Sequence, residues 1–299
     1  MKNIMLTEDK ELNLRYERYR TILENLTIMD DIFMRNVLKS VECTEYILQV
    51  IMEDHDLQVV DQALQKDYKN LQGRSAVLDC VAKDSSGKQY NMEFQQDNEG
   101  AEPKRARYHS GLMDMNILNP RENYAELPVN VVIFITQKDV LGYGLPIYHI
   151  ERKIAEIDEN FRDESHIIYV NTKAKEQKDT ELGRLMHDLN CKSADEMYSE
   201  VLAKRVSELK ETQEGVEVMC REMEELYHEG ITIGEKRGIK IGEQRGEKRG
   251  EQRGERKAKM EMAISLAKEG MSIEKIAEIA KESVQLVQKW LDGSVNLAN

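Results

Sequence analysis

The stretch that decides the fold runs from Val77 to Gln96 and reads VLDCVAKDSSGKQYNMEFQQ. Its second half alternates apolar and polar side chains, which is typical of a half-buried β-strand. The short apolar run over residues 77–82 favours a strand that is buried on both faces. Between them, Asp84-Ser-Ser-Gly87 is a turn signal, because glycine is free to adopt a positive φ. The stretch therefore predicts a β-hairpin with a three-residue Ser-Ser-Gly loop.

Two carboxylates face each other in this predicted hairpin. Counting back from the loop places Val81 opposite Asn91, and Asp79 opposite Glu93. Directly opposed side chains have Cβ atoms roughly 5 Å apart, where like charges are destabilising. A divalent cation between them would reverse the sign of that interaction, and hard cations such as Mg²⁺ prefer carboxylate oxygens. The pair is a candidate metal site; the alternatives are an ordinary surface acid pair and a register that differs by one residue.

Composition limits the classes of function. The chain has 299 residues, a length that fits one large domain or two smaller ones, and a net charge of −13. This charge argues against coating of nucleic acid by bulk electrostatics, but not against a nuclease, whose active site must itself be acidic to hold metal. No stretch approaches the ~20 apolar residues of a membrane span. Four widely spaced cysteines indicate buried free thiols of a cytoplasmic protein, and the six histidines show no metal-ligand spacing.

The order of patterns along the chain predicts a mixed α/β domain around one central sheet. We expect one helix over residues 28–52 capped by Asp30 or Asp31, a strand over 57–65, the hairpin, a helix over 102–118 with Pro103 near its start, strands over 129–136, 145–150 and 165–172, and charged helices over 180–229. Of these, the strand over residues 129–136 has the strongest signal, because it is apolar on both faces.

The chain then changes character at residue 230. Glycine recurs every four residues, at 230, 234, 238, 242, 246, 250 and 254. On a helix each step of four advances about 40° beyond a full turn, so these glycines would form a slowly winding stripe. Glutamates at 243, 247, 251 and 255 and arginines at 245, 249 and 253 would form two further stripes. Because each Gly costs ~1 kcal/mol of helix propensity relative to Ala, the alternatives are a flexible linker and a helix that forms on self-association.

The last segment has the spacing of a small helix-turn-helix unit. One helix ends near Gly270, a second starts at Ser272, and Val284, Val287 and Trp290 indicate a third. Its charges nearly balance, so a packing or oligomerisation module is at least as well supported as a DNA-binding one.

Several motifs resemble the Rpn group of recombination-promoting nucleases, which are PD-(D/E)XK nuclease family transposases. The stretch LDCVAKDSSGKQYNMEFQ resembles the family hairpin, and KRARYHSGL resembles the Arg-rich start of the helix that follows it. The glycine tail with LAKEGMSIEKIAEI is also similar, and MDDIF resembles the Asp-x-x-Phe opening of the family's first helix. The resemblance covers nearly the whole chain. It implies a restriction-endonuclease-like mixed central sheet flanked by helices, followed by a helical C-terminal extension.

The resemblance also implies site residues. Asp79 and Glu93 would bind Mg²⁺ (or Mn²⁺), Gln95 would stand where the wider superfamily has Lys, and Asp30 would be a further metal-binding acid. Gln95 can orient a water but supplies no positive charge, so Arg105 or the metal would have to supply it. Arg105 and Arg107 would bind the DNA backbone, the alternative being a solvated helix face. For Asp30 the alternative is a plain N-cap.

These features predict three parts: a PD-(D/E)XK nuclease-like domain over residues 1–225, a Gly-every-four charged helix or linker over 226–256, and a helical module over 257–299. The predicted function is a metal-dependent DNA endonuclease acting in DNA recombination or mobile-element biology, with a homo-oligomer formed through residues 230–254 and no membrane partner. The alternative is a non-catalytic interaction protein that retains the nuclease fold and self-associates through its tail.

Overall fold

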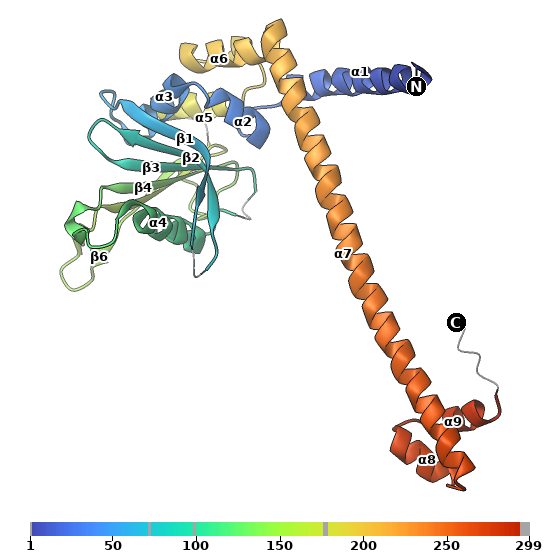
Figure 1. Cartoon of the computed structure of the whole chain (residues 1–299). Coiled ribbons are helices and arrows are strands. Elements are labelled where there is room, and N and C mark those ends of the chain that lie inside the picture. Colours follow the sequence, from blue (N-terminus) through green and yellow to red (C-terminus); the bar gives the residue numbers. More distant parts are fainter. Residues whose placement is uncertain (1, 71–72, 98–99, 176–178, 294–299) are drawn as a thin grey trace. The chain divides into compact units, whose positions relative to one another are not determined.

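The computed structural model describes residues 2–70, 73–97, 100–175 and 179–293 (Figure 1). It divides into two compact units, Met1–Glu225 and Leu226–Asn299, and the boundary falls inside one long helix. Residues 294–299 of the predicted C-terminal module lie outside the described residues. The three-part division of the sequence stays a prediction.

The first unit is built on a six-stranded mixed sheet with the strand order β1-β2-β3-β4-β8-β5. The strands are β1 Val59–Tyr68, β2 Ala76–Asp84, β3 Gln89–Gln95, β4 Asn130–Thr136, β5 Ile147–Ile150 and β8 Ser165–Asn171. Strands β1, β2 and β3 are antiparallel neighbours, β3, β4 and β8 are parallel, and β5 is antiparallel to β8. A separate two-stranded ribbon pairs β6 Lys153–Ile154 with β7 Glu159–Asn160.

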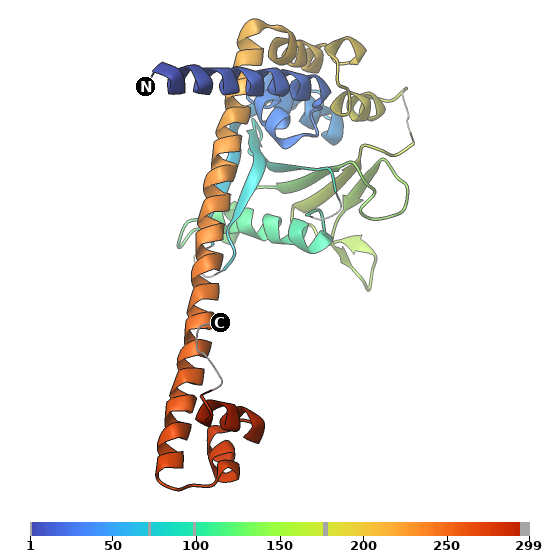
Figure 2. The same cartoon turned by 90° about the vertical axis from the view of Figure 1, so that its right-hand side faces the viewer.

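Helices cover both faces of the sheet (Figures 1 and 2). They are α1 Lys2–Asn25, α2 Asp31–Val37, α3 Val41–Met52, α4 Pro103–Ile117, α5 Glu181–Leu189, α6 Glu200–Glu211 and the start of α7 Gln213–Lys268, with 3-10 turns at Tyr124–Glu126 and Ala194–Glu196. The larger core joins one sheet face to α1, α2, α3, α5, α6 and the first turns of α7. The smaller core joins the other face to α4. The predicted fold class, a mixed central sheet flanked by helices and followed by a helical extension, is confirmed.

The hairpin has the predicted register. Val81 pairs with Asn91, and the Asp84 amide donates to the Lys88 carbonyl at 3.1 Å. Gly87 has φ +95°, a conformation that side chains with a Cβ rarely adopt. Local turn chemistry was therefore sufficient to predict the loop.

The predicted single helix over residues 28–52 is wrong. The chain forms α2 and α3 with a bend between them, and Ser40 occupies the N-cap position of α3 with extended backbone. The carbonyl groups freed at the bend find partners from other elements: Gln62 donates to the Leu38 carbonyl, and Arg205 to that of Asn36. These tertiary bonds satisfy polar groups that a continuous helix would have paired internally.

The other predicted elements of the first unit are present. Strand β4 is buried along its whole length, as its uninterrupted apolar run indicates. Helix α4 begins at Pro103. Proline has no N–H, and this costs nothing here because an N–H at the first helical position would have no intrahelical partner. Helix α1 and the ribbon β6–β7 were not predicted.

The second unit contains the remainder of α7, then α8 Ile273–Ala280 and α9 Val284–Leu291. These helices share a small core of Ala263, Ile276, Ala277, Ala280, Val287 and Trp290. The residues at the seven repeated glycine positions are helical and exposed, and a Cβ added at any of them would meet open space. The segment is therefore a helix in this structure.

The cysteines and the hydropathy of the helices were also considered in the sequence. Cys43, Cys80, Cys191 and Cys220 are buried and free, as predicted. Among the described helices, none is both long and apolar enough to cross a membrane.

Candidate active site

Asp79 and Glu93 lie together between strands β2 and β3. The regular ladder ends at Cys80 paired with Met92, and beyond it each carboxylate reaches the backbone of the opposite strand. The Phe94 amide donates to Asp79 Oδ2 at 3.1 Å, and the Asp79 amide lies 3.4 Å from Glu93 Oε1. The two strands are therefore joined at this point by side-chain oxygens in place of carbonyl groups.

The environment of the pair disfavours two negative charges. Glu93 is fully buried and Asp79 is half-buried. Burial, followed by the charge of Glu93, raises the pKa of Asp79 to about 6. Hydrogen bonds from Phe94 and from Gln65 Nε2, the latter 3.2 Å from Asp79 Oδ1, offset only part of this rise. The fold thus holds two acids close together at a free-energy cost, an arrangement typical of functional sites.

Helix α4 supplies the partners of Glu93. Arg105 Nη2 lies 3.3 Å from Glu93 Oε2, and His109 Nδ1 lies 3.4 Å from Glu93 Oε1. Arg105 Nε donates to His109 Nε2 at 3.3 Å, so Nε2 is an acceptor. Nδ1 lies 3.4 Å from both Glu93 Oε1 and Asn91 Nδ2. His109 is buried, and its place beside Glu93 was not predicted from sequence.

Gln95 and Arg105 converge on Gly100. The Arg105 Nη1 atom donates to the Gly100 carbonyl at 2.7 Å. A Cβ added at Gly100 would lie 2.6 Å from Arg105 Nη1 and 2.7 Å from Gln95 Oε1, and the φ of +99° itself favours glycine. Gly100 thus lets two predicted site residues approach one backbone segment beside the acid pair.

The contacts of the other two predicted residues are with groups other than the acid pair or with solvent. Arg107 is exposed on α4. The Asp30 carboxylate accepts hydrogen bonds from the Thr27 amide at 2.7 Å, the Thr27 hydroxyl at 3.0 Å and Gln96 Nε2 at 2.8 Å. It occupies the N-cap position of α2 without a side-chain capping bond. The charge that reaches Asp79 from this helix is that of Asp31, which adds to the rise in the pKa of Asp79.

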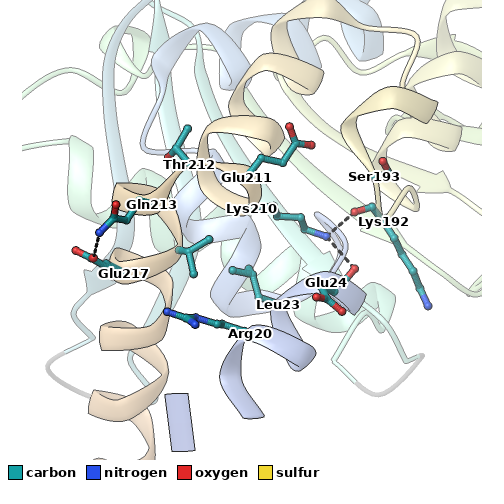
Figure 3. Close-up of a pocket in the computed structure, with 11 residues that line it drawn as sticks. Arg20, Leu23, Glu24, Lys192, Ser193, Lys210, Glu211, Thr212, Gln213 and Glu217 are labelled. Atoms are coloured by element: carbon teal, nitrogen blue, oxygen red, sulfur yellow. Dashed lines mark hydrogen bonds between the residues drawn. The ribbon is translucent and has the colours of Figure 1, made fainter. Parts of the chain in front are cut away.

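A cavity of about 640 Å³ lies elsewhere in the first unit (Figure 3). Its walls come from α1, α6, the start of α7 and the segment at Lys192, whereas β2 and β3 carry the acid pair. Its most buried cation, Lys210, donates to the carbonyls of Leu26 and Lys192, both at 2.6 Å, and burial lowers its pKa to about 8. These bonds explain the lysine as a tie between segments of the fold.

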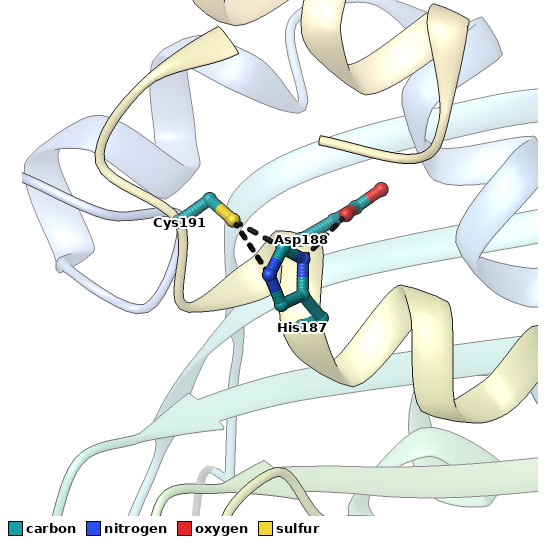
Figure 4. Close-up of side chains that lie close together, drawn as sticks. All are labelled: His187, Asp188 and Cys191. Atoms are coloured by element: carbon teal, nitrogen blue, oxygen red, sulfur yellow. Dashed lines mark hydrogen bonds and ion pairs between the residues drawn. The ribbon is translucent and has the colours of Figure 1, made fainter. Parts of the chain in front are cut away.

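His187, Asp188 and Cys191 form a further group of possible metal ligands (Figure 4). Cys191 Sγ lies 3.3 Å from His187 Nδ1, and Asp188 Oδ1 lies 3.2 Å from the same nitrogen. The spacing of four between His187 and Cys191 was overlooked in the sequence. The buried Asp188 carboxylate already accepts the amides of Tyr198 at 2.9 Å and Ser199 at 2.8 Å, which anchors the start of α6. Burial raises the pKa of Cys191 to about 11, which favours the neutral thiol.

Three residues beside the acid pair were not predicted from the sequence, and all three lie on segments other than the hairpin. Gln65 lies on β1, Gly100 lies just before α4, and His109 lies on α4. None has a spacing relation to Asp79 or Glu93 along the chain. One sequence signal existed for His109: it lies four residues, about one helical turn, after Arg105, so the two side chains share a helix face. That signal is useful only once Arg105 is known to face the acids.

Comparison with known protein families gives one match. A family model described as PD-(D/E)XK nuclease family transposase matches residues 45–230, which include β1–β3, α4 and the acid pair. No curated protein and no solved structure matches the chain. The family match covers more than half of the chain, and it spans the hairpin whose two carboxylates define the site. The chain belongs to the PD-(D/E)XK nuclease family transposases.

Proposed function

We propose that this chain is a metal-dependent DNA endonuclease that hydrolyses phosphodiester bonds in DNA recombination or in the movement of mobile elements. The single observation that carries the proposal is the acid pair Asp79–Glu93. Both carboxylates lie between two strands, and burial together with the charge of Glu93 disfavours the ionised form of Asp79. A purely structural hairpin gains nothing from that repulsion.

The donor set fits a hard divalent cation. Carboxylate oxygens are the ligands that Mg²⁺ and Mn²⁺ prefer, and Asp79 with Glu93 would hold the ion. Such an ion supplies positive charge that polarises the scissile phosphodiester and favours ionisation of the attacking water. Nuclease families of this type generally use divalent metals. We propose that Mg²⁺ is the physiological ion and that Mn²⁺ can replace it.

The neighbouring side chains have separate proposed roles. Gln95 shares a strand face with Glu93, and its amide would orient the attacking water. The Arg105 guanidinium lies beside Glu93 and supplies the positive charge that Gln95 lacks, so it would stabilise the phosphate in the transition state. Arg107 is exposed and would hold the DNA backbone. Asp30 already accepts three hydrogen bonds from Thr27 and Gln96, so we assign the ion first to Asp79 and Glu93 and keep Asp30 as a candidate further ligand.

The test is cleavage of supercoiled plasmid with Mg²⁺, with Mn²⁺ and with EDTA. Wild-type protein should nick or linearise the plasmid only with metal, and Asp79→Ala and Glu93→Ala should not. The matched control is Asp61→Ala, which removes an exposed carboxylate from β1 and should leave cleavage unchanged. Metal-independent cleavage, or equal cleavage by wild type and both variants, would contradict the proposal.

The second candidate is a non-catalytic interaction protein with the same fold. Two observations favour it: Gln95 stands where the wider superfamily has Lys, and the net charge of −13 opposes DNA binding away from the site. The plasmid assay separates the two, since this candidate predicts no metal-dependent cleavage although Asp79 and Glu93 are intact. The four free cysteines fit the reducing cytoplasm under either function.

We also propose that residues 230–254 of α7 pair two copies of the chain in parallel. Each of the seven repeated glycines is followed by Ile or Glu. Each glycine from 234 onward is preceded by Ile or Arg. Ile231, Ile233, Ile239 and Ile241 are 42–63% exposed. Two helices meeting at the glycines would bury these isoleucines and place Glu of one copy near Arg of the other. Several such pairs, each contributing ~0.2–1 kcal/mol, would have to act together.

Sedimentation velocity tests the pairing. Substitution of Gly238, Gly242, Gly246 and Gly250 by Leu raises helix propensity but blocks close approach of the backbones. Wild type should sediment as a dimer at tens of micromolar and the substituted chain as a monomer. A monomeric wild type would refute the pairing without affecting the nuclease proposal.

A further inference from the structure

Strand β1 contains one residue with an unusual backbone conformation. Gln65 has φ +50°, the left-handed region that residues with a Cβ rarely occupy. On either side of it the ladder with β2 is regular, with Leu64 opposite Cys80 and Lys66 opposite Leu78. Gln65 therefore lies opposite Asp79, the residue that the site requires.

Both strands change faces at this point. Leu78 packs in the core under α4, whereas Cys80, two residues later, packs in the core on the opposite face. On β1, Leu64 packs against the larger core and Tyr68 lies in the smaller one. Residues an even number of positions apart share a face in a regular strand. The irregularity therefore belongs to β1 and β2 together and is centred on the pair of opposed residues.

The side chain of Gln65 uses this position to contact the site. Its Nε2 donates to Asp79 Oδ1 at 3.2 Å, while the Phe94 amide donates to Oδ2 at 3.1 Å. One donor on each oxygen fixes the plane of the carboxylate. Non-glycine residues in the left-handed region persist only where the surrounding structure offsets their strain, and they cluster at functional sites.

We infer that Gln65 is a positioning residue that holds the Asp79 carboxylate in the orientation that binds a divalent ion together with Glu93. It does for Asp79 what His109 and Arg105 do for Glu93. The inference rests on the proposed metal-dependent function. Partners of this kind, which orient a ligand without touching the metal, change metal affinity by about 10- to 100-fold when removed.

Two substitutions separate the side chain from the backbone. Gln65→Gly removes the amide and favours the positive φ, whereas Gln65→Ala removes the amide and keeps the strain. In EDTA, Gln65→Gly should unfold at or above the wild-type temperature and Gln65→Ala below it. Both variants should bind Mn²⁺ about tenfold more weakly, measured by isothermal titration and by the EPR signal of bound Mn²⁺.

The matched control is Glu53→Gly. Glu53 is exposed at the end of α3, and its φ of +53° is nearly that of Gln65. This variant should gain thermal stability and keep wild-type Mn²⁺ affinity. It measures how much stability the relief of a positive φ adds where no site contact is lost.

The outcomes distinguish the two levels of inference. Wild-type Mn²⁺ affinity in Gln65→Gly would overturn the positioning role while leaving the metal site intact. Weakened affinity in Gln65→Ala alone would show that the site does not need the amide once the backbone strain is relieved, and would also overturn it. If wild type shows no Mn²⁺ site that Asp79→Ala removes, the proposed function fails, and the role of Gln65 fails with it.

Discussion

The two ends of the β2–β3 hairpin each hold an aspartate, and their environments are opposite. At the loop end, buried Asp84 accepts hydrogen bonds from the Ser86 amide and hydroxyl, the Lys88 amide and the Tyr90 hydroxyl, at 2.7–2.9 Å. Although its burial acts to raise the pKa of Asp84, these bonds outweigh it and lower the pKa. At the open end, Asp79 has two such bonds and a second carboxylate beside it, and its pKa is raised to about 6.

The contrast separates a carboxylate whose charge the fold stabilises from one whose charge the fold disfavours. A buried acid with a full set of donors is a structural element, because its charge is balanced by groups the fold already provides. At Asp79 the two hydrogen bonds do not offset burial and the repulsion from Glu93. Asp84 has its donors within the hairpin, whereas the Asp79–Glu93 pair is the site at which we propose that a divalent cation binds.

The largest expected effect concerns cleavage. Asp79→Asn should reduce metal-dependent plasmid cleavage by at least about a thousandfold, equivalent to ~4 kcal/mol of transition-state stabilisation, because a metal ligand is lost. Asp84→Asn should cleave within a few-fold of wild type, since the Tyr90 hydroxyl can accept from the new amide. Comparable losses in both variants would show that the two ends of the hairpin do not differ in function.

The second-largest expected effect is on the free energy of unfolding, and it concerns Asp84 at the loop end of the hairpin. Asp84→Ala should lower the free energy of unfolding in EDTA by about 2–4 kcal/mol, because several buried donors lose their acceptor. Since the folded pKa of Asp84 is lowered, its stabilisation is present above about pH 4 and is lost as the pH falls through the folded pKa. Urea unfolding between pH 2.5 and 8 checks this; a difference from wild type that stays constant into acid would count against it.

The open end should show the opposite sign. Asp79→Asn should raise the free energy of unfolding in EDTA at pH 8 by about 1–3 kcal/mol, because ionised Asp79 is disfavoured in the fold. The folded pKa lies above the unfolded value, so wild type loses stability as the pH rises from about 4 to above 6, and the variant does not. The two proteins should converge below pH 4. A variant less stable than wild type at pH 8 would mean that hydrogen bonding outweighs repulsion at this site.

The smallest effect is expected at Gln95. Gln95→Lys should keep cleavage within about tenfold of wild type and leave Mn²⁺ affinity unchanged, because lysine is the residue of the wider superfamily and Glu93 offsets its charge beside Arg105. Initial cleavage rates and Mn²⁺ titration measure both quantities. Complete loss of cleavage with intact metal binding would assign a specific role to the amide and extend the functional end of the hairpin beyond its acids.

Local patterns were enough to predict the framework of this protein. The Ser-Ser-Gly loop determines the hairpin register up to Cys80 and Met92, and this register brings Asp79 beside Glu93, because turn length sets which residues pair. The buried run of β4 and the proline that begins α4 are likewise properties of a few neighbouring residues. The glycine spacing left linker and helix open, because propensity and periodicity point in opposite directions there.

The tertiary structure alone decided how distant residues complete the site. It broke the predicted helix at Ser40, where Gln62 and Arg205 satisfy the freed carbonyl groups, and it tied Asp30 to Gln96. It also brought Gln65 and His109, from two other elements, to the two acids. Each of these contacts joins segments whose separation along the chain carries no periodic signal. Their positions depend on how β1, α2 and α4 pack on the sheet, and no local pattern contains that information.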